Sequence, residues 1–176
     1  MSDPVVVVGA GPFGLSVAAN LRSRGAGTRV FGVTMGSWSG HMPAGMFLKS
    51  TPSASNLDTP SAGANLDDYC RAAGINVFDE YRDAIPIESF IEYGRWFAQQ
   101  HVPDVEDRTI SGVTRTARGF DVATADGETF AAKAVIVASG HVSHAYVPPE
   151  LSAMTNGMLS PDGPVSHASQ HADLPE

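Results

Sequence analysis

The sequence has a single cysteine, Cys70, in 176 residues, so no disulfide can form within the chain. Proteins without disulfides are typical of reducing compartments, and we expect a cytoplasmic location. Long hydrophobic runs are also missing, since none approaches the roughly 20 residues that a membrane-spanning helix requires. The opening MSDPVVVV has no basic region of the kind that begins a signal peptide. We therefore expect neither a membrane segment nor secretion.

Positive charge is scarce as well. Eleven Lys and Arg residues against nineteen Asp and Glu residues give a formal net charge of −8. The basic residues are scattered along the chain, whereas phosphate backbones and anionic membranes are bound by clusters of them. Nucleic acid and membrane surfaces are therefore not expected partners. Hydrophobic residues make up 43% of the chain, which is typical of a folded globular domain.

The apolar pattern predicts an α/β order of elements. Short apolar runs of the kind buried in parallel sheets alternate with stretches whose apolar residues recur at helical spacing. The first strand, helix and strand follow one another within about 30 residues, the length of a βαβ unit. Residues 34–64 have no period, and a loop of this length is usually functional or mobile. The predicted strands are 5–8, 28–33, 109–116, 120–124, 129–132 and 134–138, and the predicted helices are 12–24, 66–73 and 87–101.

The turn after the first predicted strand is rich in glycine. Gly9, Gly11 and Gly14 form the pattern G-x-G-x-x-G between a strand and a helix. In dinucleotide-binding folds the first glycine allows a tight turn, the second lets a diphosphate approach, and the third lets the helix pack on the strand. The helix N-terminus, here Pro12 and Phe13, then faces the anion. The alternative interpretation is a turn in an α/β protein that binds nothing.

An acidic residue is missing from the position where it would bind the ribose of a dinucleotide. Such folds place Asp or Glu about 20 residues after the glycine pattern, at the end of the second strand. This sequence has Gly32 there, and no Asp or Glu occurs between Ala10 and Asn56. Either the ribose is held by backbone groups or by Thr34, or dinucleotide binding has been weakened or lost.

Together these segments resemble the FAD-binding half of flavoproteins with two dinucleotide-binding domains, especially flavin-dependent monooxygenases and related FAD/NAD(P)-binding oxidoreductases. MGSW is similar to a glycine–tryptophan element that lies along the flavin, and MPAGMFLKSTP to a segment beside its ring system. Residues 110–140 resemble the family's three-stranded meander and the A-T-G signature that follows it, here A-S-G. The resemblance implies a Rossmann-like α/β domain that binds FAD. The predicted cofactor-binding residues are Gly9, Gly11, Pro12, Phe13, Gly14, Thr34, Gly36, Trp38, Lys49, Ser50, Val113, Ala138, Ser139 and Gly140.

Residues 1–150 are expected to form this FAD domain, and residues 151–176 an extended tail. PDGPVSHASQH keeps Gly163 and His167 at the spacing of the monooxygenase linker F-x-G-x-x-x-H-x-x-x-W, while Pro161 and His171 replace its aromatic residues. The region after His141 has no apolar period, which is typical of a linker. In the family an NADPH domain follows, and no second glycine-rich site is visible in this chain, which looks truncated beside that pattern.

The resemblance implies an FAD-dependent oxidoreductase of the monooxygenase type, acting on a small-molecule substrate. A reductase, a partner chain or a missing domain would reduce it, and apolar surface left without that domain predicts a partner or a homodimer. The alternative is a non-redox scaffold that binds a small molecule or a partner, or catalyses a non-oxidative reaction, with FAD weakly held or lost. No catalytic acid or base is indicated, and no metal is expected. Cys70 alone excludes disulfide reduction by a cysteine pair and is expected to be a buried packing residue.

Overall fold

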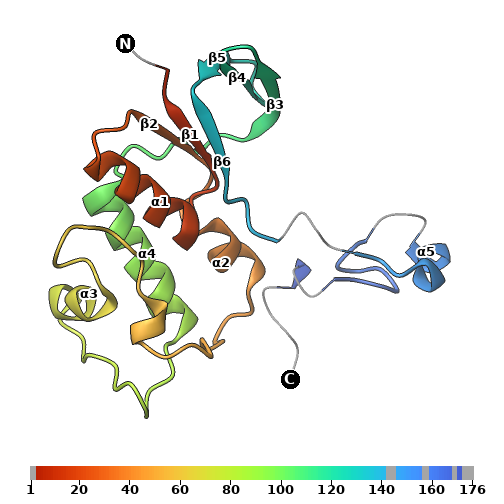
Figure 1. Ribbon diagram of the computed structural model, residues 1–176. Coiled ribbons are helices and arrows are strands. Elements are labelled where there is room, and N and C mark those ends of the chain that lie inside the picture. The colour runs from red at the N-terminus through yellow and green to blue at the C-terminus, as the bar shows by residue number, and fades with distance from the viewer. Residues whose placement is uncertain (1–2, 142–145, 156–158, 168–169, 172–176) are drawn as a thin grey trace.

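The computed structural model describes residues 3–141, 146–155, 159–167 and 170–171. Figure 1 shows β1 between β2 and β6, with the helices on one side and a small separate sheet beyond β6. The elements are β1 (Val5–Val8), α1 (Pro12–Ser23), β2 (Thr28–Phe31), α2 (Gly36–His41), η1 (Ser53–Ser55), α3 (Leu66–Ala73), α4 (Ile87–His101), β3 (Ile110–Thr116), β4 (Gly119–Thr124), β5 (Thr129–Ala132), β6 (Ala134–Val137) and α5 (Pro149–Thr155).

The central sheet is parallel and has the strand order β2-β1-β6. Residues 105–106 extend it beyond β2, where the Glu106 N–H donates to the Val30 carbonyl at 2.8 Å. β1 consists of four valines, whose branched side chains favour extended backbone. Val6 and Val7 are fully buried and belong to two different core clusters, one on each face of the sheet. The predicted α/β class with a parallel sheet and a βαβ start is confirmed.

Helices α1 and α4 cover the face of the sheet to which Val7 points. The larger core cluster joins Val7 and Val30 to Leu15 of α1 and to the apolar side of α4. The sequence predicts this side of α4 from apolar residues that recur every three or four positions, and the structure adds Tyr93 to it. The buried residues of α4 are Ile87, Phe90, Ile91, Tyr93, Gly94, Phe97 and Ala98.

An antiparallel meander of β3, β4 and β5 covers the opposite face of the sheet. Its buried side chains, Val122 and Ala132, form a second cluster with Val6 and Phe31 of the parallel sheet. The fold therefore has three layers: helices, parallel sheet and meander. The three predicted meander strands are confirmed, with ends shifted by one residue at β3 and β4.

The irregular stretch 34–64 is fixed to α4 by Tyr93. The Tyr93 hydroxyl donates to the Ala64 carbonyl at 2.8 Å and accepts from the Leu57 N–H at 3.0 Å. Burial raises the pKa of Tyr93 to about 12, so its hydroxyl stays protonated and keeps donating at neutral pH. Because both partners are backbone groups, one side chain holds the two ends of segment 57–64 against the helix.

Two α-helices and the short 3-10 helix η1 lie where the sequence predicts none. α2 is six residues long and contains two glycines and two serines, so it shows no apolar period. α5 lies in the segment expected to be extended, and its start, Pro149 and Glu150, has residues typical of a first helical turn. The tail residues 156–158, 168–169 and 172–176 lie outside the described residues. In the part of the chain that the structure describes, no helix is both long and apolar enough to cross a membrane.

Candidate functional site

The glycine turn between β1 and α1 is tightly packed against its neighbours. Gly9 has φ +113°, and a Cβ built there would overlap the carbonyl oxygen of Ala138 at the end of β6. A Cβ on Gly14 would overlap the carbonyl oxygen of Gly9, so α1 lies directly on the turn. The Gly9 N–H donates to the Phe31 carbonyl of β2 at 2.8 Å. Packing alone therefore explains glycine at the first and third positions of the pattern.

Packing does not explain why residue 11 is glycine. It is the N-cap of α1, with φ −80° and ψ −176°, and a Cβ built there would meet no atom within 4 Å. The first turn of α1 has no acidic residue, and no described side chain caps its N–H groups. An uncapped helix N-terminus with open space beside it is an arrangement that binds anions. Pro12 occupies the first position of α1, and the Phe13 side chain beside it is 83% exposed.

The end of β6 and the start of α2 lie next to this turn. The Ala138 N–H donates to the Val8 carbonyl at 2.7 Å, which holds residues 138–140 beside the end of β1. A Cβ on Gly140 would be 3.5 Å from the Ser37 hydroxyl oxygen of α2. β1 connects to β2 on one side and pairs with β6 on the other, so the carboxyl ends of β1 and β6 form a topological switch point. In α/β folds, ligands bind at such points.

Gly32 at the end of β2 has an unusual backbone. Its φ is +124°, a Cβ there would be 3.4 Å from the Ala10 nitrogen, and its N–H donates to the Glu106 carbonyl at 2.9 Å. The backbone itself therefore requires glycine. Thr34, the residue predicted to hold the ribose in its place, is half-buried two residues further on. The position where such folds place an acid therefore has, in this chain, a backbone conformation that favours glycine.

The other predicted cofactor residues lie in three different places. Gly36 begins α2, and Trp38 packs its indole edge-on against Phe90 of α4, with ring centroids 4.7 Å apart. Lys49 and Ser50 are exposed in the loop before η1, and the Ser50 hydroxyl lies 2.8 Å from the Ser55 hydroxyl. Val113 is 43% exposed on β3 of the meander. Among the described contacts, none joins Lys49, Ser50 or Val113 to the glycine turn.

A shallow cleft lies beside Trp38, between α2 and α4. Its volume is about 230 Å³, and its walls combine apolar side chains with two glutamates and an arginine. The residues of the wall are Trp38, Ser39, Met42, Pro43, Ala44, Ile87, Glu88, Ile91, Glu92 and Arg95. Sequence reasoning does not predict this cleft, because α2 itself is not predicted.

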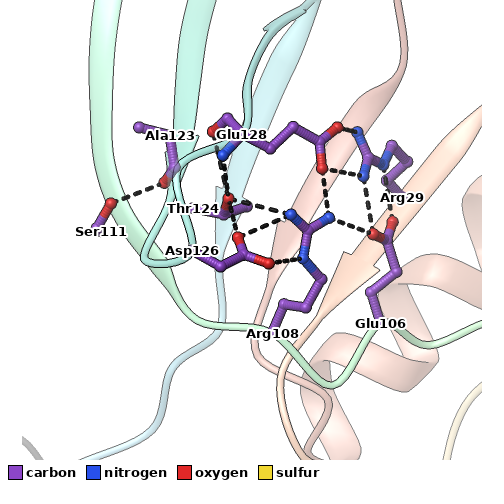
Figure 2. A network of polar contacts seen from close by, with 8 residues as sticks. All are labelled: Arg29, Glu106, Arg108, Ser111, Ala123, Thr124, Asp126 and Glu128. Atoms are coloured by element: carbon purple, nitrogen blue, oxygen red, sulfur yellow. Dashed lines mark hydrogen bonds and ion pairs between the residues drawn. The ribbon is translucent and has the colours of Figure 1, made fainter.

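A network of five charged side chains joins the meander to β2 and to segment 105–108 (Figure 2). Arg29 Nε lies 2.7 Å from Glu106 Oε1, and Arg29 Nη1 lies 3.0 Å from Glu128 Oε1. Arg108 pairs with Glu106, with Glu128 and, at 2.8 Å, with Asp126. Hydrogen bonds from Arg108 lower the pKa of Asp126 to about 2, and those from Arg29 lower the pKa of Glu106 and of Glu128. Every charge has an opposite partner, so the network is a structural clamp.

Cys70 is fully buried in α3, and burial raises the pKa of its thiol. The prediction that Cys70 is a packing residue is confirmed. The described residues contain no group of three His, Cys, Asp or Glu side chains that could hold a metal ion.

No protein-family model and no curated protein sequence matches the chain. Solved structures do match. A flavin-containing monooxygenase from Stenotrophomonas maltophilia is 23% identical over 83% of this chain and 41% of its own, with a TM-score of 0.67. A lysine monooxygenase from Nocardia farcinica is 17% identical over 77% of this chain and 43% of its own, and a bacillithiol disulfide reductase from Staphylococcus aureus is 16% identical over 78% and 38%, both with TM-scores of 0.63.

The chain spans about two fifths of the length of these structures. At these identities the similarity concerns the fold. Over about four fifths of its length, the chain therefore shares the Rossmann-like fold of one part of these larger structures, as the sequence resemblance predicts.

Proposed function

We propose that this chain contains the FAD-binding domain of a flavin-dependent oxidoreductase of the monooxygenase type, acting on a small molecule. One observation supports this most directly. Of the three glycines in the turn, Gly11 alone leaves open space beside an uncapped helix N-terminus. A turn that served packing alone would need glycine at positions 9 and 14, but not at 11. The space lies at the switch point of the sheet, where α/β folds bind ligands.

The described residues fit a dinucleotide. Gly11 and the first N–H groups of α1 would hold the diphosphate, because these donors have no side-chain partner among the described residues. Ser139 and Gly140 would border the same space from β6, and Thr34 would take a ribose hydroxyl. Bound flavin would supply the redox chemistry, accepting hydride and activating oxygen. The chain's own contribution is to bind and orient the cofactor.

A reductant site would come from outside the described fold. The similar solved structures are more than twice as long as the part that this chain matches. Phe13 and Val137 lie at the carboxyl edge of the sheet and are 83% and 73% exposed. Exposed apolar side chains next to a binding site are typical of surfaces that a further domain or a partner chain covers.

The second candidate is a non-redox scaffold, and Gly32 favours it. Its φ of +124° disfavours any residue with a side chain at the position where such folds place the ribose-binding acid. This candidate and the first one differ in one measurable property. A flavin oxidoreductase domain binds FAD, whereas the scaffold leaves added FAD free.

The test is a fluorescence titration of FAD with the wild-type chain and with Gly11→Asp. Aspartate is a favourable N-cap, so the variant should unfold at the same temperature or higher. Its carboxylate would stand where the diphosphate binds, and we expect FAD affinity to fall by about 100-fold, since like charges in one site cost several kcal/mol.

Gly27→Asp is the matched control. It makes the same charge change at the amino end of β2, where a Cβ also meets no atom within 4 Å. We expect it to bind FAD as the wild type does. If wild-type protein leaves FAD fluorescence unquenched, or if Gly11→Asp binds as well as Gly27→Asp, the proposed function is wrong.

A further inference from the structure

The connection between β2 and α2 contains a residue in an unusual conformation. Met35 has φ 57° and ψ 21°, in the left-handed region, and it is the one residue other than glycine with positive φ in the described chain. Long side chains are uncommon there, and such outliers persist where surrounding contacts impose them. Met35 is fully buried, so these contacts lie inside the protein.

The backbone of Met35 joins the glycine turn to α2. Its N–H donates to the Ala10 carbonyl at 3.0 Å, and its carbonyl accepts from the Trp38 N–H at 3.0 Å. Ala10 stands between Gly9, which packs on β6, and Gly11, which borders the open space. The hydrogen bond from Met35 therefore holds the middle of the proposed diphosphate loop.

The side chain of Met35 lies against Gly94 of α4. A Cβ built at Gly94 would overlap Met35 Sδ and would lie 2.6 Å from Cγ and 2.8 Å from Cε. Gly94 is inside a long helix, where glycine is less favourable than alanine. The gap at Gly94 is thus a seat for the Met35 side chain, and a larger residue would displace it.

We propose that Met35 is a positioning residue of the dinucleotide site. Its side chain, seated at Gly94, fixes the place of its own N–H, and that N–H fixes the glycine turn through Ala10. The inference rests on the proposed function, because its effect is read in FAD affinity. Donors that are held in place before the ligand arrives bind it without an ordering cost. Helix α4 supports the turn through this residue.

The first test is Gly94→Ala. The added methyl group overpacks the seat, and since Met35 is fully buried, its side chain cannot move into solvent. We expect FAD to bind about tenfold more weakly, the effect of a modest overpacking penalty. Gly40→Ala is the matched control, because Gly40 is an exposed glycine in α2 whose added Cβ would meet no atom within 4 Å. It should leave the affinity unchanged within about twofold.

The second test replaces Met35 itself. Met35→Leu keeps a similar volume and should retain the affinity within about threefold, whereas Met35→Ala empties the seat and should weaken binding about tenfold. In the Met35→Ala background Gly94→Ala no longer meets the side chain, so it should cost less than about twofold. An equal effect of Gly94→Ala in both backgrounds would overturn the proposal. If Gly94→Ala alone does not fold, the comparison of Met35→Leu with Met35→Ala decides.

A third measurement needs no ligand. The amide of residue 35 should exchange hydrogen faster in Met35→Ala than in Met35→Leu, while amides in the middle of α1 exchange at equal rates. Equal exchange at residue 35 would overturn the inference. If the wild-type chain binds no FAD, the proposed function is wrong. The exchange measurement still tests whether the Met35 side chain, packed at Gly94, holds its own N–H in place.

Discussion

At the scale of single residues, the glycines of the β1–α1 turn differ in what constrains them. Gly9 and Gly14 are fixed by backbone atoms that leave no room for a Cβ, whereas a Cβ on Gly11 would meet no atom within 4 Å. A residue that the fold does not require to be glycine is the one whose substitution can separate folding from binding. For this reason the functional test uses Gly11, and substitutions of Gly9 or Gly14 would report stability alone.

Gly32 permits a prediction at the same scale. Restoring the acid by Gly32→Glu should not improve FAD binding, because φ +124° suits glycine and not residues with a side chain. The strained backbone should lower the free energy of unfolding by about 1–3 kcal/mol. Urea denaturation measures the loss, and FAD titration measures the affinity.

Val33→Glu is the control for the added charge. Val33 is 58% exposed and its φ is not positive, so the same carboxylate one residue later should leave stability nearly unchanged. Tighter FAD binding by Gly32→Glu, with a free energy of unfolding equal to that of Val33→Glu, would contradict this prediction. Position 32 would then tolerate the acid, and its backbone would not require glycine.

At the scale of elements, the meander is attached to the sheet by two kinds of contact. Val122 and Ala132 pack on Val6 and Phe31 in a small apolar cluster. At its border, the guanidinium carbon of Arg29 lies 4.0 Å from the centroid of the Phe130 ring. The same arginine belongs to the charged network, in which it pairs with Glu106 and Glu128 (Figure 2). Isolated surface ion pairs contribute little to stability, but a network in which each arginine binds several carboxylates is held more rigidly.

This network predicts a loss of stability in acid. The folded state lowers the pKa of Glu106, Glu128 and Asp126, that of Asp126 to about 2. A carboxylate with a lowered pKa stabilises the fold at pH values above its unfolded pKa, and this stabilisation is lost as the pH falls toward its folded pKa. The stability to urea should therefore decline between about pH 5 and pH 2.

Arg108→Gln should make this decline shallower, because it removes the main partner of Asp126. The control is Arg95→Gln, which breaks an exposed pair with Glu92 on α4 and should leave the acid dependence as in the wild type. Equal pH profiles for the two variants would show that the clamp does not set the acid stability of the protein.

At the scale of the whole molecule, the sequence predicts the elements whose apolar residues recur at a regular spacing. It does not predict the features that depend on single contacts between distant residues. The parallel strands, α3, α4 and the meander follow apolar spacing or a turn signal, and their predicted positions agree with the structure to within two residues. The sequence also predicts the glycine turn, because the spacing of its glycines is typical of a tight turn between a strand and a helix. Three other features join residues that are far apart in the chain, so no local sequence pattern predicts them. They are the pairing of residues 105–106 with β2, the charged network, and the packing of Met35 against Gly94.

The same limit applies to the candidate site. The sequence predicts the segments 9–14, 36–38 and 138–140 separately. The structure brings 138–140 to the glycine turn because β1 and β6 are neighbours in the sheet, and it brings 36–38 there through the hydrogen bond from the Met35 N–H to the Ala10 carbonyl. Met35 was not among the predicted residues, since its role depends on its φ and on a glycine 59 positions away. A methionine in a loop has no distinguishing sequence signal, although a glycine inside a predicted helix, such as Gly94, is a signal of close packing.

The last prediction concerns how the whole chain responds to a reductant. We expect the 176-residue chain, loaded with FAD under anaerobic conditions, to keep its flavin absorbance when NADPH is added, because the described fold provides one dinucleotide turn and FAD would occupy it. Dithionite, a small diffusible reductant, should bleach the same sample, which shows that the flavin is accessible and redox-active. A separately expressed reductase or NADPH-binding partner should restore bleaching by NADPH. Rapid bleaching by NADPH alone would show that the nicotinamide binds elsewhere on this chain, and the exposed apolar edge at Phe13 and Val137 would then be a place to search for that site.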